Sequence, residues 1–188
     1  MQLLSEEFRT IDAFITLSPL PQFRKWLETK VKQSDKNSSF YDDTLLDHES
    51  FDALIKSGLI DGQGKTEKNR VLYRLLEALD DPALLVEHHD ILRPIVSKLM
   101  ARYLVLEKHR NKPLDPVARF HVGNGAEVWR LNYAADLSRN GMRNSFGGMV
   151  NYRYNLDSLV DNQRNHELAH LVPVHHQVSR WVELNSHL

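Results

Sequence analysis

The fold is constrained most by residues 13–31, which begin with Ala13-Phe14-Ile15-Thr16-Leu17-Ser18-Pro19-Leu20-Pro21. The apolar and β-branched run at 13–17 predicts a buried strand. We expect Ser18-Pro19 to stop that strand, because proline cannot donate a backbone hydrogen bond to a sheet. A helix should follow, since apolar side chains recur at helical spacing at Phe23, Trp26, Leu27 and Val31.

Helical patterns dominate the next part of the chain. Apolar residues recur at helical spacing around 51–55, across 71–79 and across 92–106. Pro94 would be tolerated only in the first turn of its helix. The polar stretch 34–43 and the glycine-containing stretch 58–65 are typical of loops. We therefore predict a helical insert over residues 34–110, and we interpret residues 2–8 as the last turns of a further helix.

A capped helix is predicted to begin at Asp115-Pro116 and to run to about Ser138. Within it, Gly123 and Gly125 would each cost about 1 kcal/mol against alanine, so a partner or ligand should approach closely there. Residues 149–154 alternate as a strand does, and 174–184 should form a terminal helix. The predicted division is one unit made of 1–33 and 111–155, the insert 34–110, and a tail with a helix at 156–188.

Composition narrows the class of protein. The 188 residues are 41% hydrophobic and 26% charged, with a net charge of −1. That balance fits one globular domain and favours neither nucleic acid nor an anionic membrane as partner. The absence of cysteine excludes disulfides, cysteine zinc sites and a thiol nucleophile.

Localisation is predicted from the apolar runs and the chain ends. No apolar run reaches the roughly 18 residues of a membrane span, and the first residues lack a signal peptide. We expect a soluble cytoplasmic protein. The peroxisomal alternative rests on the final tripeptide Ser186-His187-Leu188.

Three segments, in the same order, resemble the malonyl-CoA decarboxylase family. They match the family's strand end, its histidine-containing helix and its final strand, and the resemblance extends over residues 3–155. Their sequences are Leu17-Ser18-Pro19-Leu20-Pro21-Gln22-Phe23, Pro116-Val117-Ala118-Arg119-Phe120-His121-Val122-Gly123-Asn124-Gly125-Ala126 and Met149-Val150-Asn151-Tyr152-Arg153-Tyr154.

The resemblance implies an α/β, predominantly helical fold, namely the C-terminal part of a GNAT-like acyl-CoA-binding domain. It implies conversion of malonyl-CoA to acetyl-CoA and carbon dioxide without metal or organic cofactor. The family's catalytic serine and histidine fall on Ser18 and His121. The family's upstream half, which cradles the CoA pyrophosphate, has no counterpart here. An inactive fragment that serves as an interaction module is therefore an alternative, and the helical insert suits contacts in a homo-oligomer.

Such a pair suits the chemistry, because loss of carbon dioxide leaves an enolate that needs hydrogen-bond donors and a proton. We expect Ser18 and His121 to meet in space. His121 should be the general acid and Ser18 a donor to the leaving carboxylate or a proton relay, although these roles could be exchanged. His121 falls in the first turns of the predicted helix, where the helix dipole favours neutral imidazole. Asn124 and Tyr152 are candidate thioester or pantetheine contacts.

A competing motif is His166-Glu167-Leu168-Ala169-His170, which fits the zinc pattern H-E-x-x-H, with His176 as a third candidate ligand. Pro173 stands where the longer motif has glycine, and no methionine follows Met149. With 10 histidines in 188 residues, a chance match is unsurprising. We therefore rank catalysis by zinc below the decarboxylase reading and assign no metal ligand.

Overall fold

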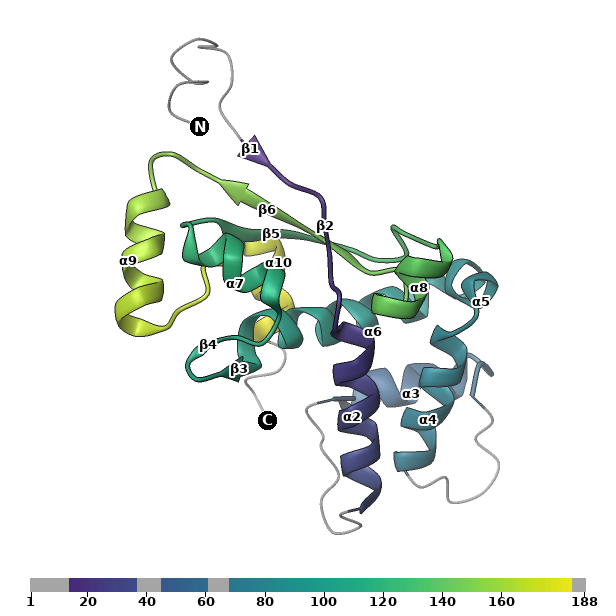
Figure 1. The fold of residues 1–188 in the computed structure, drawn as a ribbon. Helices are drawn as coiled ribbons and strands as arrows, with labels where there is room; N and C mark the ends of the chain where they lie inside the picture. Colours follow the sequence, from purple (N-terminus) through teal and green to yellow (C-terminus); the bar gives the residue numbers. More distant parts are fainter. Residues whose placement is uncertain (1–13, 37–44, 61–67, 184–188) are drawn as a thin grey trace.

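The computed structural model describes residues 14–36, 45–60 and 68–183, and the helix expected at 2–8 lies outside them. The described part is α/β and mostly helical, as predicted (Figure 1). The helices are α2 (Phe23–Lys36), α3 (His48–Lys56), α4 (Lys68–Leu79), α5 (Pro82–Glu87), α6 (His89–Ala101), the π-helix η1 (Arg102–Leu106), α7 (Pro116–Gly123), α8 (Arg139–Ser145), α9 (Leu159–Ala169) and α10 (His176–Glu183). The strands are β1 (Phe14–Ile15), β2 (Ser18–Pro19), β3 (Lys108–His109), β4 (Lys112–Pro113), β5 (Glu127–Asn132) and β6 (Met149–Tyr154).

Strand β6 is the centre of the main sheet. It pairs antiparallel with β5 along one side and with both β1 and β2 along the other. The expectation that Ser18-Pro19 stops the strand is wrong, because β2 continues the sheet with Ser18 opposite Val150. Pro19 is tolerated since β2 lies at the sheet edge in the described part of the chain.

The first strand is also less buried than expected. Phe14 and Ser18 face the same side as their partners Tyr154 and Val150. The alternating pleat therefore turns Ile15 and Leu17 to the opposite side, where they are 45% and 60% exposed. The predicted buried strand is thus an edge strand with one covered face.

The helical stripes predicted at 23–31, 51–55, 71–79 and 92–106 are confirmed as α2, α3, α4 and α6 with η1, and the terminal helix as α10. Residues 34–36 belong to α2, while 37–43 and 61–65 of the expected loops lie outside the described residues. Pro94 lies in the second turn of α6 rather than the first. The carbonyl that loses its partner there belongs to exposed Asp90, which water can reach.

The single helix predicted over 115–138 is wrong. Asp115 caps α7 as expected, accepting the backbone N–H groups of Val117 and Ala118 at 2.9 and 2.8 Å. The helix ends at Gly123, Gly125 adopts φ +83°, and β5 begins at Glu127. The two glycines therefore terminate a short helix and turn the chain, and no ligand is needed to explain them.

One continuous apolar core joins the sheet to the helices. It contains Phe23 and Leu27 of α2, Leu99 of α6, Val122 of α7 and Val150 of β6. In Figure 1, α7 and α9 lie near the left end of the sheet, whereas α2 to α5 lie toward the right of the view, beside α6. No helix in the described ranges is both long and apolar enough to cross a membrane. The GNAT-like architecture and the three-part division stay predictions.

Gly125 and Gly123 make a matched pair for testing how α7 ends. A Cβ at Gly125 would clash with the Leu159 carbonyl oxygen and lie 2.9 Å from Leu159 Cγ, at a positive φ. Gly125→Ala should lower the free energy of unfolding by about 2 kcal/mol or more. Gly123→Ala meets nothing within 4 Å and should be neutral or stabilising by up to about 1 kcal/mol. Urea denaturation of both variants measures the difference, and equal effects would contradict this account of the turn.

Candidate active site

Ser18 and His121, which lie 103 residues apart in the sequence, meet on the α7 side of the sheet. Ser18 Oγ lies 3.4 Å from His121 Nε2. Strand β2 supplies the serine, and the last turn of α7 supplies the histidine. The distance is at the long end for a hydrogen bond, as is common for catalytic groups without a bound substrate. The predicted meeting of the two residues is confirmed, while their catalytic roles stay a prediction.

Two tyrosines of β6 hold the His121 ring. The Tyr154 hydroxyl lies 2.7 Å from His121 Nδ1. The Tyr152 ring stacks on the imidazole with 4.4 Å between centroids and 22° between planes. Residues 152 and 154 face the same side of the strand because side chains alternate. The imidazole is thereby fixed in its plane by one tyrosine and along its edge by the other.

A chain of polar groups positions Ser18 from the strand side. Thr16 Oγ1 lies 3.0 Å from Ser18 Oγ. The Asn151 side-chain amide donates to the Thr16 carbonyl at 2.7 Å, and Asn132 donates to the Asn151 side-chain oxygen at 2.8 Å. This network crosses β5, β6 and the segment between β1 and β2, so the serine sits in a rigid part of the sheet.

Burial favours the uncharged forms of His121 and Tyr154. It lowers the pKa of His121 from the ordinary 6.5, since a charged ring loses hydration. Burial likewise raises the pKa of Tyr154, which stays a phenol. The expectation that a helix N-terminus favours neutral imidazole is wrong, because His121 lies in the last turn of α7. The dipole there favours a cation, so burial is the cause of the lowered pKa.

Buried Asp115 anchors α7 from below. Besides capping the helix, its carboxylate accepts a hydrogen bond from the Tyr103 hydroxyl at 3.0 Å. Burial raises the pKa of Asp115, while hydrogen bonds from Ala118, Tyr103 and Val117 oppose that rise. Because Tyr103 belongs to η1, this contact fixes the helix that carries His121 against the helical part of the chain.

The two predicted substrate contacts lie in different settings. Asn124 is exposed, and its amide donates to the Phe120 carbonyl at 2.8 Å. Tyr152 is fully buried, and its hydroxyl has no hydrogen-bond partner among the described residues. What Tyr152 contacts in this structure is the ring of His121. A contact of either residue with substrate stays a prediction.

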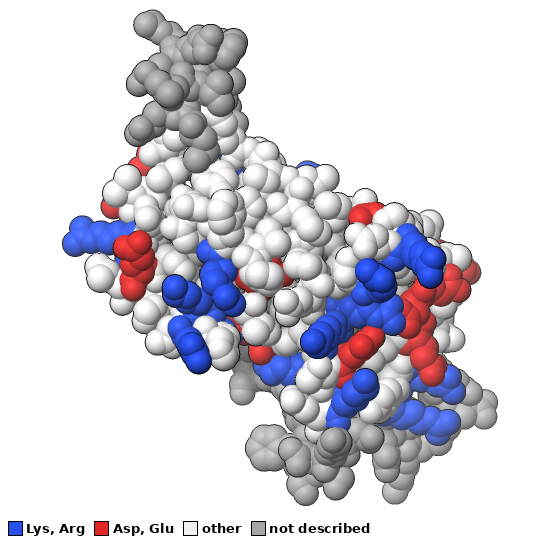
Figure 2. Space-filling view, viewed as in Figure 1, with Lys and Arg blue, Asp and Glu red and all other residues white. Residues whose placement is uncertain are grey.

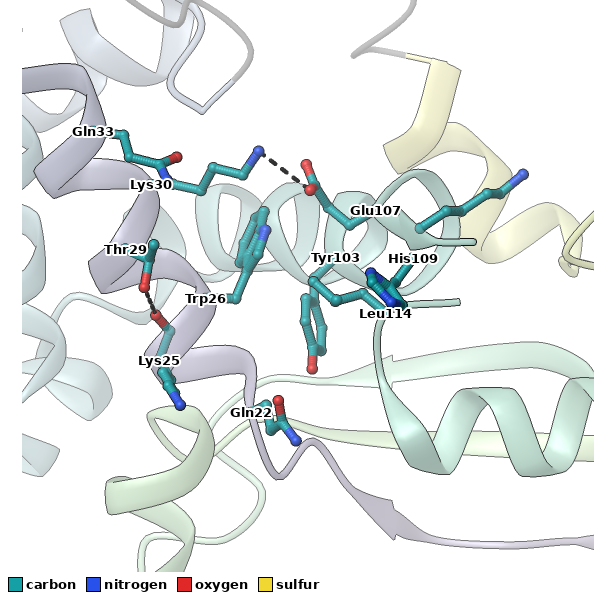
Figure 3. Close-up of a pocket in the computed structure, with 11 residues that line it drawn as sticks. Gln22, Lys25, Trp26, Thr29, Lys30, Gln33, Tyr103, Glu107, His109 and Leu114 are labelled. Carbon is teal, nitrogen blue, oxygen red and sulfur yellow. Dashed lines mark hydrogen bonds and ion pairs between the residues drawn. The ribbon is translucent and has the colours of Figure 1, made fainter. Parts of the chain in front are cut away.

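A separate pocket of about 360 Å³ lies between α2, η1 and β3 (Figure 3). Trp26, Tyr103 and Leu114 supply apolar surface to it. Two of its lining residues form an ion pair: Nζ of Lys30 in α2 lies 3.2 Å from Oε2 of Glu107, which follows η1. Neither Ser18 nor His121 is among its lining residues. The pocket and the serine–histidine pair are therefore distinct features.

The zinc geometry of the H-E-x-x-H motif is not formed. Helix α9 ends at Ala169, and His170 adopts the left-handed conformation with φ 55°. His166 and His170 therefore do not face one another across a helical turn. The Nδ1 atom of His166 lies 2.8 Å from the Leu171 carbonyl oxygen. Within residues 14–36, 45–60 and 68–183, no group of three histidine, cysteine or acidic side chains could hold a metal ion.

Sequence reasoning missed Tyr154 as a member of this site. The signal was present in the strand pattern, because Tyr152 and Tyr154 occupy the same face of β6. Only the packed structure shows which tyrosine meets the ring edge and which the ring plane. The other missed groups are Thr16, Asn151 and Asn132, whose polar side chains alone carry no sign of a shared network.

Comparison with known proteins places this geometry in a family. The signature of the malonyl-CoA decarboxylase C-terminal domain matches residues 1–183. The malonyl-CoA decarboxylases of Rattus norvegicus and Mus musculus, both named as mitochondrial, are each 37% identical over 172 residues. In each case the match covers 85% of this chain and 30% of the relative. The chain thus spans about a third of the length of the curated relatives it matches.

Solved structures agree. The malonyl-CoA decarboxylase of Cupriavidus metallidurans aligns with a TM-score of 0.74 at 30% identity, covering 96% of this chain and 41% of that one. The enzyme from Rhodopseudomonas palustris aligns with a TM-score of 0.71 at 33% identity, covering 96% and 35%.

The relatives also correct the expected localisation. A cytoplasmic protein, with a peroxisomal alternative, is contradicted by curated relatives that are named as mitochondrial. The expectation rests on the ends of this chain, which are uninformative when the chain spans so little of its relatives. The match over 1–183, the identities above 30% and the shared fold lead to one conclusion. The chain belongs to the malonyl-CoA decarboxylase family and corresponds to that family's C-terminal domain.

Proposed function

We propose that this chain provides the serine–histidine part of an active site that decarboxylates malonyl-CoA to acetyl-CoA. The observation that carries the proposal is the contact between Ser18 Oγ and His121 Nε2. Each side chain is held by further residues, so the two reacting groups are oriented before substrate arrives. Family membership supplies the substrate class, since the relatives are named for malonyl-CoA.

We propose one arrangement of the protons around His121, which the hydrogen-bond distances support. Tyr154 stays a phenol, and in the proposed arrangement its O–H donates to His121 Nδ1 over 2.7 Å. A neutral imidazole that accepts at Nδ1 carries its hydrogen on Nε2. That hydrogen points toward Ser18 Oγ. In this proposed arrangement His121 is the proton donor, and the Ser18 hydroxyl donates to an oxygen of the substrate.

The proposed reaction consists of loss of carbon dioxide followed by protonation of the enolate. The bond between the α-carbon and the carboxylate breaks, carbon dioxide leaves, and the electron pair passes into the thioester enolate. The enolate carbon takes the Nε2 proton of His121, which yields the methyl group of acetyl-CoA. A proton from solvent restores the imidazole. During transfer, negative charge grows on the imidazole ring, and the Tyr154 O–H at Nδ1 stabilises it.

The first prediction concerns the pair itself. His121→Gln should lower the rate of carbon dioxide release about 10²- to 10⁴-fold, the usual worth of a general acid. Ser18→Ala should lower kcat about 10²- to 10³-fold, as loss of a donor to a developing oxyanion does. His109→Gln, which alters an exposed histidine of β3, is the control.

Two proteins serve for this assay: the 188-residue chain and a chimera. In the chimera, residues 1–183 replace the matched part of the Rhodopseudomonas palustris decarboxylase. The chimera provides the segments that a chain spanning 35% of that protein lacks. An active chimera whose His121→Gln variant turns over normally would refute the proposal.

A second prediction separates positioning from proton donation. Tyr154→Phe keeps the ring packing but removes the hydrogen bond to Nδ1. We expect kcat to fall about tenfold, the value of one hydrogen bond of about 1.4 kcal/mol, with KM nearly unchanged. Tyr133→Phe is the matched control, because it also removes one phenolic hydroxyl, which donates to the Leu85 carbonyl at 2.9 Å and not to His121. Equal losses in the two variants would argue against the assigned proton pattern.

A third prediction follows from the lowered pKa of His121. The unfolded chain, where the pKa returns to about 6.5, binds a proton that the folded chain resists. The contribution of His121 to stability is therefore complete above pH 6.5 and declines as the pH falls through 6.5 to the folded pKa. Urea denaturation at pH 7.5 and 5.5 should show a smaller loss on acidification in His121→Gln than in the unsubstituted chain. An unchanged loss would show that the ring is not buried as described.

A further inference from the structure

The residues of the H-E-x-x-H motif line a pocket of about 400 Å³ that the proposed reaction does not use. It lies where β4, α7 and α9 meet. Its lining residues are Lys112, Arg119, Gly123, His166, Glu167 and His170. Arg119 and His121 are two positions apart on α7, about 200° around the helix. The pocket therefore opens on the side of α7 away from the serine–histidine pair.

The charges that line this pocket are mainly positive. The Arg119 guanidinium donates through Nε and Nη2 to the Pro113 carbonyl at 3.3 and 3.2 Å. An arginine held by a carbonyl keeps its full charge and a fixed direction. Lys112 has no ion-pair partner among the described residues, and Glu167 is the only acidic residue in the lining. Glu167 Oε1 accepts from Gln163 at 3.4 Å.

Neighbouring groups reinforce that charge. Lys108 donates to the His170 carbonyl at 2.8 Å, which brings a further ammonium beside α9. Figure 2 shows a group of lysine and arginine side chains over the β3–β4 hairpin, next to α7 and α9. Such a concentration of cations around a hollow attracts anions rather than metal ions.

His166 supplies the polar floor. The residue is buried, with a relative exposure of 6%. A carbonyl can only accept, so Nδ1 carries a hydrogen and donates to Leu171. The other ring nitrogen, Nε2, has no partner within the described ranges. Nε2 is also not among the fully enclosed unpartnered polar atoms, which are Trp26 Nε1 and Tyr152 Oη. Nε2 is therefore not fully enclosed, and His166 is one of the residues that line the pocket.

We propose that this pocket binds a phosphate-type oxyanion. Arg119 and Lys112 supply positive charge, and Nε2 of His166 accepts a hydrogen bond from an O–H of the phosphate. Charge-assisted hydrogen bonds of this kind are the strong ones in proteins. The anion is either free phosphate or the phosphate ester of a coenzyme A molecule. The inference does not depend on the proposed decarboxylase activity.

Isothermal titration of the 188-residue chain at constant ionic strength tests this, with inorganic phosphate, coenzyme A and 3′-dephospho-coenzyme A as separate probes. We expect one site for at least one probe, with binding about tenfold or more weaker in Arg119→Gln and in Lys112→Gln. Arg164→Gln removes the same charge from the exposed surface of α9, outside the pocket, and should bind as the unsubstituted chain does. Tighter binding of coenzyme A than of its dephospho form would identify the ester as the source. Binding of inorganic phosphate alone would identify the free anion.

His166→Asn completes the set, because asparagine keeps a donor near the Nδ1 position and removes Nε2. It should retain the helical circular dichroism of the chain and weaken phosphate binding. If the buried His166→Asn variant unfolds, Lys112→Gln still tests the proposal, because Lys112 is exposed. Absence of binding for all three probes, or equal weakening in Arg164→Gln, would overturn the proposal. So would stoichiometric binding of Zn²⁺ that is lost in His166→Asn.

Discussion

The antiparallel pairing of β2 with β6 is the constraint on which the site depends. Ser18 stands opposite Val150, so its hydroxyl faces the side of the sheet where Tyr152, Tyr154 and α7 meet. A slip of one residue would turn the serine to the other face. The register is fixed by Asn151, whose side chain ties β6 both to the Thr16 carbonyl and to Asn132 of β5. Three strands together therefore hold Ser18 in contact with His121, which lies 103 residues away in the sequence.

The amphipathic helices could be predicted because each buries one apolar face, as Phe23, Leu27 and Val31 do in α2. Strand β5 could not. In it only Val128 is fully buried, so no period of two is visible, and Val128 with Leu131 has helical spacing. The helix predicted through this region ends at Gly123, and Gly125 takes a positive φ beside Leu159. The glycines end α7, and Gly125 also permits the close approach of Leu159 at the start of α9, a tertiary contact that no local pattern encodes.

The candidate site was predicted in part: the contact between Ser18 and His121 was expected and is observed, while the residues that hold them were not expected. Ser18 and His121 were named from their motifs, and Tyr152 from the strand that also contains Tyr154. Both tyrosines lie on one face, yet one stacks on the imidazole plane and the other meets Nδ1. No metal was assigned to the histidine motif at 166–170, and the structure shows a feature of it that the sequence did not. Its spacing suits zinc only while the helix continues, and α9 ends at Ala169.

Helix α7 keeps two kinds of chemistry apart within eight residues. On one side, burial holds His121 neutral and Tyr154 protonated. On the other, Arg119 and Lys112 present full charges to solvent. Arg119 and His121 lie about 200° apart around the helix, so α7 places its charged and its neutral groups on opposite sides.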